Sequence, residues 1–131
     1  MTNTLLLRMA LAVILFSHSF FSIASGDVNH FGRDYLDKIG FEPLGLLLAW
    51  MIKLTHLVSI PFLLFNRKIK TIAIANILIF VAGIILIHFK EGWFVVGGGR
   101  NGMEFNFLLI CCFLSLMFPN GLLHKLTPRQ P

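Results

Sequence analysis

The chain has 131 residues, of which 56% are hydrophobic and only 13% are charged. A water-soluble domain carries roughly twice that share of charged residues, so the composition predicts an integral membrane protein. The formal net charge is +5, but the basic residues stand in loops beside apolar stretches, so we do not expect nucleic acid as a partner.

Four apolar stretches are each close to the roughly 20 residues that a membrane-spanning helix needs. They are residues 5–24, 44–65, 69–89 and 103–119, the last being the shortest. We therefore expect an all-α fold: a single domain over residues 1–131 that forms an integral membrane four-helix bundle, with a short periplasmic amphipathic helix and a glycine-rich periplasmic loop.

In the first stretch, Arg8 precedes an apolar run, and Ser22-Ile23-Ala24 resembles a small-residue cleavage site. A secretory signal is therefore the alternative to a retained helix. We interpret the stretch as a retained transmembrane helix. His18 would then lie on the order of 10 Å inside its outer boundary, at about 1.5 Å of rise per residue.

The loop that follows has an amphipathic pattern. Phe31, Tyr35 and Ile39 stand at positions i, i+4 and i+8 with charged residues between them, and Gly40 can end a helix. The pattern predicts a short helix on the membrane surface, with the two aromatic rings at the level of the lipid headgroups. The alternative is a lid that only covers the bundle.

The second stretch contains two ionisable residues one helical turn apart, Lys53 and His56. A lysine at the centre of a membrane helix costs roughly 2.5 to 3.5 kcal/mol. We therefore expect Lys53 to face the bundle and to have a partner there.

The distribution of basic residues predicts the orientation, because short cytoplasmic loops carry an excess of Lys and Arg. Arg67, Lys68 and Lys70 lie in the turn after the second stretch, and Lys125 and Arg129 lie in the C-terminal tail. The chain should be a multi-pass protein of the bacterial inner (cytoplasmic) membrane with both termini in the cytoplasm.

A glycine-rich loop separates the third and fourth stretches. Its candidate residues are Gly97, Gly98, Gly99, Arg100 and Gly102. The loop formally matches GxGxxG but no predicted strand precedes it, so we do not expect a dinucleotide site.

Glu104 follows this loop, at the first turn of the last helix. Unpaired N–H groups and the helix dipole favour negative charge at that position. Along the same helix Glu104, Leu108, Cys111 and Ser115 share one stripe, which we expect to face inward.

Five ionisable residues from all four stretches should converge in the outer half of the bundle. They are His18, Lys53, His56, His88 and Glu104. They could form a polar pocket that exchanges protons or binds the headgroup of a quinone. The alternative is a structural network in which Glu104 neutralises Lys53.

No catalytic arrangement is apparent, and the histidine spacing is not that of metal ligands on one helix face. Cys111 and Cys112 are adjacent on a helix, where their side chains diverge by about 100° and cannot easily bridge. We expect no metal and no thiol chemistry, and we interpret both cysteines as apolar fillers.

Several segments together resemble the DoxX family of small four-helix membrane proteins, which includes the small subunit of thiosulfate:quinone oxidoreductase. The resemblance is carried by Arg8-Met9-Ala10-Leu11-Ala12 through Phe16-Ser17-His18, Gly40-Phe41, Arg67, and His88 followed by Gly92-Trp93-Phe94, Gly97-Gly98 and Glu104. One departure is that Lys53 stands where the family usually has a Glu, and His56 where a glycine is common. The role of that Glu is therefore not carried over.

The resemblance implies a small subunit associated with a quinone-linked respiratory or thiol/sulfur redox complex. Such a subunit would contact membrane lipid and other membrane-protein subunits, with quinone as its ligand and no covalently bound cofactor. At most it would be a non-catalytic or quinone-interacting part of an oxidoreductase. The alternative is an accessory or assembly subunit that only stabilises a larger membrane complex.

Overall fold

The computed structural model describes residues 4–97 and 100–121, in which the regular elements are all helices and neither range contains a strand. These described residues belong to two compact units: an N-terminal unit of residues 8–67, and a C-terminal unit of residues 68–97 and 100–121 together with residues 4–7. The elements are α1 (Leu5–Ala24), α2 (Asp27–His30), the π-helix η1 (Phe31–Phe41), α3 (Gly45–Leu64), α4 (Ile69–Leu86), the 3-10 helix η2 (His88–Glu91) and α5 (Glu104–Met117). The predicted all-α class is confirmed.

Three helices, α1, α3 and α4, are long and apolar enough to cross a membrane, which indicates a multi-pass membrane protein in contact with lipid. The fourth predicted stretch forms only the 14 residues of α5. At about 1.5 Å per residue this helix is roughly 21 Å long, against a hydrocarbon core of about 30 Å. A fourth span therefore stays a prediction, as do the orientation and the single domain.

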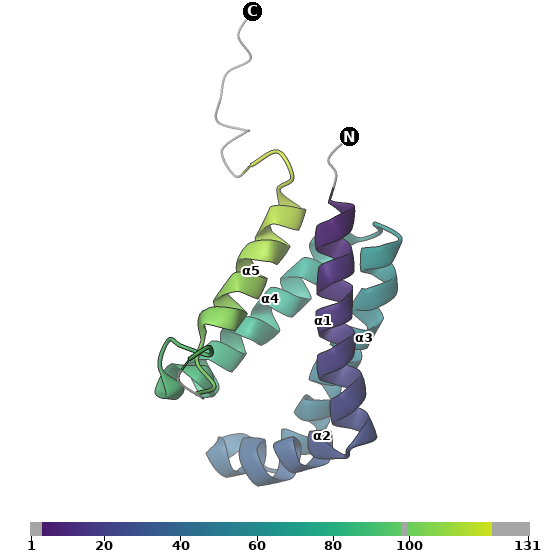
Figure 1. Cartoon of the computed structure of the whole chain (residues 1–131). Coiled ribbons are helices and arrows are strands. Elements are labelled where there is room, and N and C mark those ends of the chain that lie inside the picture. The colour runs from purple at the N-terminus through teal and green to yellow at the C-terminus, as the bar shows by residue number, and fades with distance from the viewer. Residues whose placement is uncertain (1–3, 98–99, 122–131) are drawn as a thin grey trace, which may run out of the picture. The chain divides into compact units, whose positions relative to one another are not determined.

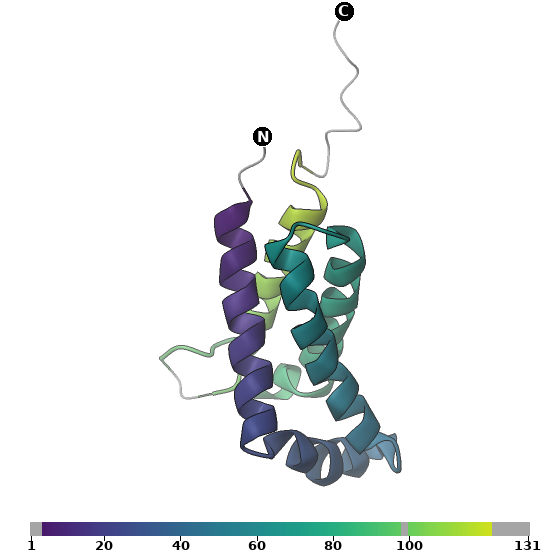
Figure 2. The ribbon, with the colours of Figure 1, turned by 90° about the vertical axis from the view of Figure 1, so that its right-hand side faces the viewer.

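In the N-terminal unit, α1 and α3 run in opposite directions, and α2 and η1 connect them at one end (Figures 1 and 2). At the other end of the pair, Arg8 Nη1 donates hydrogen bonds to the carbonyl oxygens of Leu63 and Leu64, at 2.8 and 3.2 Å. The last carbonyls of a helix have no partner within it, so Arg8 caps the C-terminal end of α3.

The connection packs on the beginning of α3 through two glycines. A Cβ atom on Gly32 would lie 2.6 Å from the Cα of Leu46, so any side chain there would clash with backbone. Next to this crossing, Asp37 Oδ1 accepts a hydrogen bond from the backbone N–H of Gly45 at 2.8 Å. An unpaired N–H at the start of α3 thus finds a carboxylate, which also matches the positive end of the helix dipole.

The predicted short helix exists, and the residues that it buries against the protein are not those of the apolar stripe expected at the membrane surface. Gly40 has φ = +116° and breaks the helix where expected. The buried residues are Val28, Gly32 and Leu36, whereas Ile39 is exposed. The reason is the glycine crossing, since the side of the helix with the smallest residue comes closest to α3.

In the C-terminal unit, α4 and α5 lie side by side and antiparallel (Figure 1). The rings of Phe80 and Phe113 are 6.0 Å apart, and Asn106 Nδ2 donates to the Phe80 carbonyl oxygen at 3.4 Å. Gly83 faces the Asn106 side chain. An aromatic contact, a hydrogen bond and a close approach at a glycine therefore join the two helices.

Within the C-terminal unit, the stripe that α5 buries differs from the one that we expect to face the inside of a four-helix bundle. Leu109, Phe113 and Leu116 are buried, whereas Leu108 and Ser115 are exposed. Large apolar residues at i, i+4 and i+7 give α5 more packing surface than the narrow polar stripe would. The Ser115 hydroxyl needs no partner on another helix because it donates to the Cys111 carbonyl at 2.9 Å.

Candidate functional site

Three of the five predicted pocket residues belong to the N-terminal unit, where α1 and α3 bring them together. The Lys53 ammonium donates a hydrogen bond to the backbone carbonyl oxygen of His18, 3.1 Å away. The Lys53 side chain is half-buried, in the middle of a helix that can cross the membrane. A cation at this depth needs a polar partner, and here it finds one in the neighbouring helix.

His56 lies one turn beyond Lys53 on α3, and 6% of its surface is exposed. Lys53 and His18 are both near enough to act on it electrostatically. The His18 ring itself is exposed on α1. We call these three residues, His18, Lys53 and His56, the α1–α3 polar cluster.

Sequence reasoning missed an acidic neighbour of this cluster. Asp27, the first residue of α2, attracts the Lys53 ammonium. Gly26, with φ = +81°, reverses the chain just before it, so the carboxylate follows the end of α1 directly. The available signal was the position of Asp27, which follows the last residue of α1, Ala24, by three residues.

The hydroxyl groups near the cluster donate hydrogen bonds to backbone carbonyl groups of α3 itself. Ser59 Oγ donates to the Thr55 carbonyl and Thr55 Oγ1 donates to the Met51 carbonyl, both at 2.7 Å. Such bonds satisfy a buried hydroxyl without a second helix. The Thr55 and Ser59 hydroxyl groups are thus satisfied by carbonyl groups of α3 itself.

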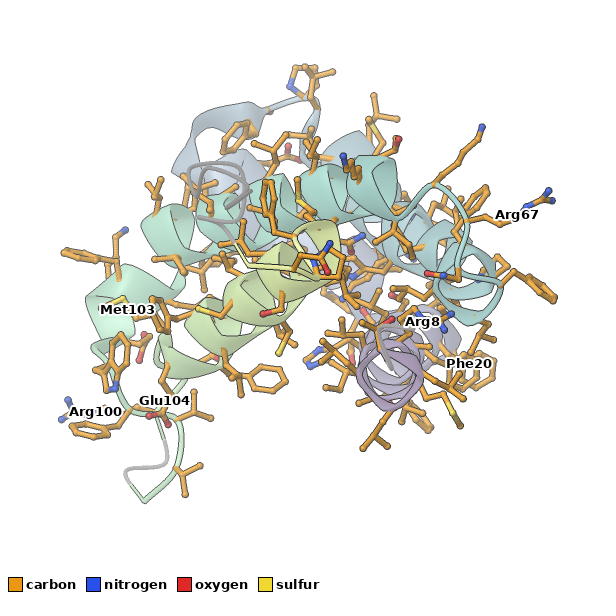
Figure 3. All side chains as sticks on the ribbon, turned by 90° about the horizontal axis from the view of Figure 1, so that it is seen from above. Arg8, Phe20, Arg67, Arg100, Met103 and Glu104 are labelled. Carbon is orange, nitrogen blue, oxygen red and sulfur yellow. The ribbon has the colours of Figure 1, made fainter. Side chains whose placement is uncertain are left out.

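Glu104 and His88 hold the loop of the C-terminal unit. Glu104 Oε1 accepts hydrogen bonds from the backbone N–H groups of Val95 and Val96, at 2.7 and 3.1 Å. These two bonds hold the pKa of the Glu104 carboxyl below its usual value. His88 Nδ1 donates to the Asn101 carbonyl oxygen at 2.7 Å. Glu104 lies at the start of α5 beside Met103 and the loop that carries Arg100 (Figure 3).

Two glycines of this loop allow a backbone conformation or a close contact that a side chain would prevent. Gly97 has φ = +83°, a conformation that favours glycine. Gly102 is buried against the carbonyl groups of Trp93 and Phe94, where a Cβ atom would not fit. Gly98 and Gly99 lie outside the described residues, and Arg100 is exposed.

The structure therefore groups His18, Lys53 and His56 in one unit and gives His88 and Glu104 contacts within the other. The convergence of all five in one pocket stays a prediction. Within the N-terminal unit, Lys53 has the His18 carbonyl oxygen as a hydrogen-bond partner. Its pairing with Glu104, which belongs to the other unit, stays a prediction.

Within residues 4–97 and 100–121, no three His, Cys, Asp or Glu side chains are placed to hold a metal ion. Cys111 and Cys112 are free thiols and are half-buried on α5.

Comparison with known proteins gives no family. No family model matches the chain, and neither a curated protein nor a solved structure matches it.

Proposed function

We propose that this chain is a small DoxX-like membrane subunit that binds the headgroup of a quinone at the α1–α3 polar cluster, on behalf of a larger redox complex. The observation that supports the proposal most is the placement of Lys53. Its ammonium group lies within a span and bonds the His18 carbonyl, with His56 one turn away.

The chemistry of this cluster suits a quinone. Quinone carbonyl oxygens only accept hydrogen bonds, and lysine and histidine donate them. Ionisable residues inside membrane spans commonly mark ligand or proton pathways. The two carbonyls of a quinone headgroup would be met by Lys53 and His56, which stand one turn apart on one face of α3.

The electrons would come from a partner subunit or a soluble donor. Among the described residues we find no metal-binding group, and the two thiols are adjacent on a helix. The proposed role of this chain is therefore to bind and position the quinone.

A second candidate function is favoured by the same hydrogen bond. Because Lys53 already has a protein partner in α1, the cluster can also act purely to hold α1 and α3 together. The chain would then be an accessory subunit that stabilises other membrane proteins.

Quinone binding can be measured with Trp50, which lies one turn before Lys53 on α3. In nanodiscs, the Trp93→Phe chain leaves Trp50 as its only tryptophan, since the sequence contains two. A short-chain quinone should quench its fluorescence saturably. Lys53→Met and His56→Leu should each weaken the apparent affinity about tenfold, which corresponds to the loss of about 1.4 kcal/mol of hydrogen bonding.

Thr55→Val is the matched control, since the Thr55 hydroxyl bonds only the Met51 carbonyl among the contacts described for it. It should bind quinone like the parent chain. Linear quenching without saturation, unchanged by Lys53→Met, would refute quinone binding and favour the accessory role. Copurification from the native membrane would then identify the proteins that it stabilises.

A further inference from the structure

An apolar surface lies on the segment that joins α4 to α5. Phe89, Phe94 and Val96 are 67%, 63% and 82% exposed, and Trp93 is 44% exposed. Four large apolar side chains within eight residues are unusual on a surface that meets water. We call these four residues the apolar tip.

Hydrogen bonds hold the apolar tip against the beginning of α5. Backbone hydrogen bonds join Met103 N–H to the Gly92 carbonyl at 3.1 Å and Glu104 N–H to the Trp93 carbonyl at 3.0 Å. The Glu104 carboxylate adds its two bonds to the N–H groups of Val95 and Val96. The beginning of α5 thus fixes the apolar tip in place, and its exposure is a feature of the folded loop.

One side of the tip is also tied to α5 by an aromatic contact. The rings of Trp93 and Phe107 are 5.6 Å apart. Gly102 lies against the carbonyl groups of Trp93 and Phe94, so the beginning and the end of the loop are in direct contact. The base of the tip is therefore held against α5, while the Phe94 and Val96 side chains stay exposed.

Two observations, position and charge, favour a lipid bilayer as the partner of the tip. The first is position: the tip begins three residues after Leu86, the last residue of α4, which can cross a membrane. At this point the chain leaves the hydrocarbon layer and meets the lipid headgroups.

The second observation is charge. Lys90 and Arg100 are exposed on the same loop, against the single acidic side chain of Glu91, which is also exposed. Arg100 lies at the same end of the unit as Glu104 and Met103 (Figure 3). Aromatic side chains between two cations match a bilayer surface that carries phosphate groups.

We infer that the apolar tip inserts at the membrane interface, with Phe94 and Val96 in the acyl-chain boundary and Lys90 and Arg100 bound to the phosphates of anionic phospholipids. Glu104 is then a positioning residue: it touches no lipid, but holds the tip in the shape that inserts. This role is separate from quinone binding at the α1–α3 polar cluster.

Tryptophan depth measurements test the inference. The Trp50→Phe chain retains only Trp93, and it is reconstituted in vesicles of phosphatidylcholine with or without phosphatidylglycerol. Lipids brominated near the headgroup should quench Trp93 more strongly than lipids brominated near the chain end. Phosphatidylglycerol should increase this quenching, and the double change Lys90→Gln with Arg100→Gln should remove the increase.

Lys38→Gln is the matched charge control, since Lys38 is exposed on η1 in the other unit. It should leave the effect of phosphatidylglycerol intact. Glu104→Gln should shift Trp93 emission to the red and weaken quenching by brominated lipid.

The inference is overturned by strong quenching of Trp93 by aqueous iodide with no effect of brominated lipids, or by strongest quenching from bromines at the chain end. An equal response in the two vesicle types would overturn the binding of anionic headgroups. If Glu104→Gln fails to fold, a spin label on Val96→Cys in a chain with Cys111→Ala and Cys112→Ala reports the same depth.

Discussion

The Glu104 carboxylate accepts a hydrogen bond from the backbone N–H of Val95 at 2.7 Å, nine residues back along the chain. The same oxygen also accepts from Val96, so one side chain satisfies two consecutive backbone donors of a loop. The first residue of a helix is thus the residue that shapes the loop before it.

This arrangement predicts a dependence of stability on pH. The two backbone bonds lower the pKa of Glu104 from its ordinary value of 4.5. A lowered carboxyl pKa means stabilisation that is present above the unfolded pKa and is lost as the pH falls through the folded pKa. Glu104→Gln should lower Tm by a few degrees near neutral pH and should flatten the fall of Tm in acid.

Thermal unfolding in detergent micelles between neutral and acidic pH measures this effect. Asp34 also has a lowered pKa, because His30 bonds it, so it contributes to the acid transition as well. The comparison is therefore between the parent and Glu104→Gln, and Asp34→Asn separates the second contribution. Identical acid profiles for the parent and Glu104→Gln would contradict the prediction.

A second prediction concerns the beginning of α3. Asp37 Oδ1 accepts from the Gly45 N–H at 2.8 Å, and Asp37→Ala removes this partner. Loss of a comparable helix cap costs about 1 kcal/mol. Chemical unfolding should therefore show a lower free energy of unfolding for Asp37→Ala, while Lys38→Ala, at the next and exposed position of the same helix, should change it much less.

A third prediction concerns the crossing of η1 and α3. Gly32→Ala places a Cβ atom 2.6 Å from the Cα of Leu46 and 3.0 Å from the Gly45 carbonyl oxygen, and neither is a side chain that can move aside. Overpacking of this kind costs about 1–3 kcal/mol. Arg33→Ala at the next, exposed position is the control and should unfold like the parent. Equal unfolding midpoints for Gly32→Ala and Arg33→Ala would contradict the prediction, because they would show that η1 and α3 can move apart at little cost.

Hydropathy predicted the helices well because apolar length alone determines a span. The predicted first stretch, residues 5–24, coincides with α1, and the second differs from α3 by one residue at each end. The third was predicted to reach Phe89, but α4 ends at Leu86 and a 3-10 turn holds His88. The apolar composition continues past the helix end there, so hydropathy could not locate it.

Contacts between elements were harder to predict, because they depend on shape. Nothing in the pattern of η1 distinguishes Gly32 from the other glycines, yet its missing side chain decides which face meets α3. Lys53 was expected to have a partner, and that partner is the backbone carbonyl of His18. Every residue has a backbone carbonyl, so the sequence does not indicate which one is bonded. His18 was predicted as a site residue because of its imidazole ring. Glu104 was expected near a helix start, and the structure adds the backbone donors that it binds.

The last prediction concerns the side of the membrane on which the chain ends. Three spans, α1, α3 and α4, would place the two ends on opposite sides, whereas a fourth span through α5 returns the C-terminus to the side of the N-terminus. We expect the second arrangement. Although α5 is roughly 21 Å long, the interfacial tip before it and the apolar Phe118 after it extend its reach, and bilayers thin locally around short segments.

Cysteine labelling decides between these arrangements. In a chain with Cys111→Ala and Cys112→Ala, Asn66→Cys reports the basic turn and Asn120→Cys reports the exposed residue after α5. The positive-inside tendency places the turn with Arg67 and Lys68 in the cytoplasm. Both cysteines should therefore resist a membrane-impermeant maleimide in intact cells and react after lysis. Labelling of Asn120→Cys alone in intact cells would leave three spans and place α5 on the outer surface, where the apolar tip would still meet the headgroups.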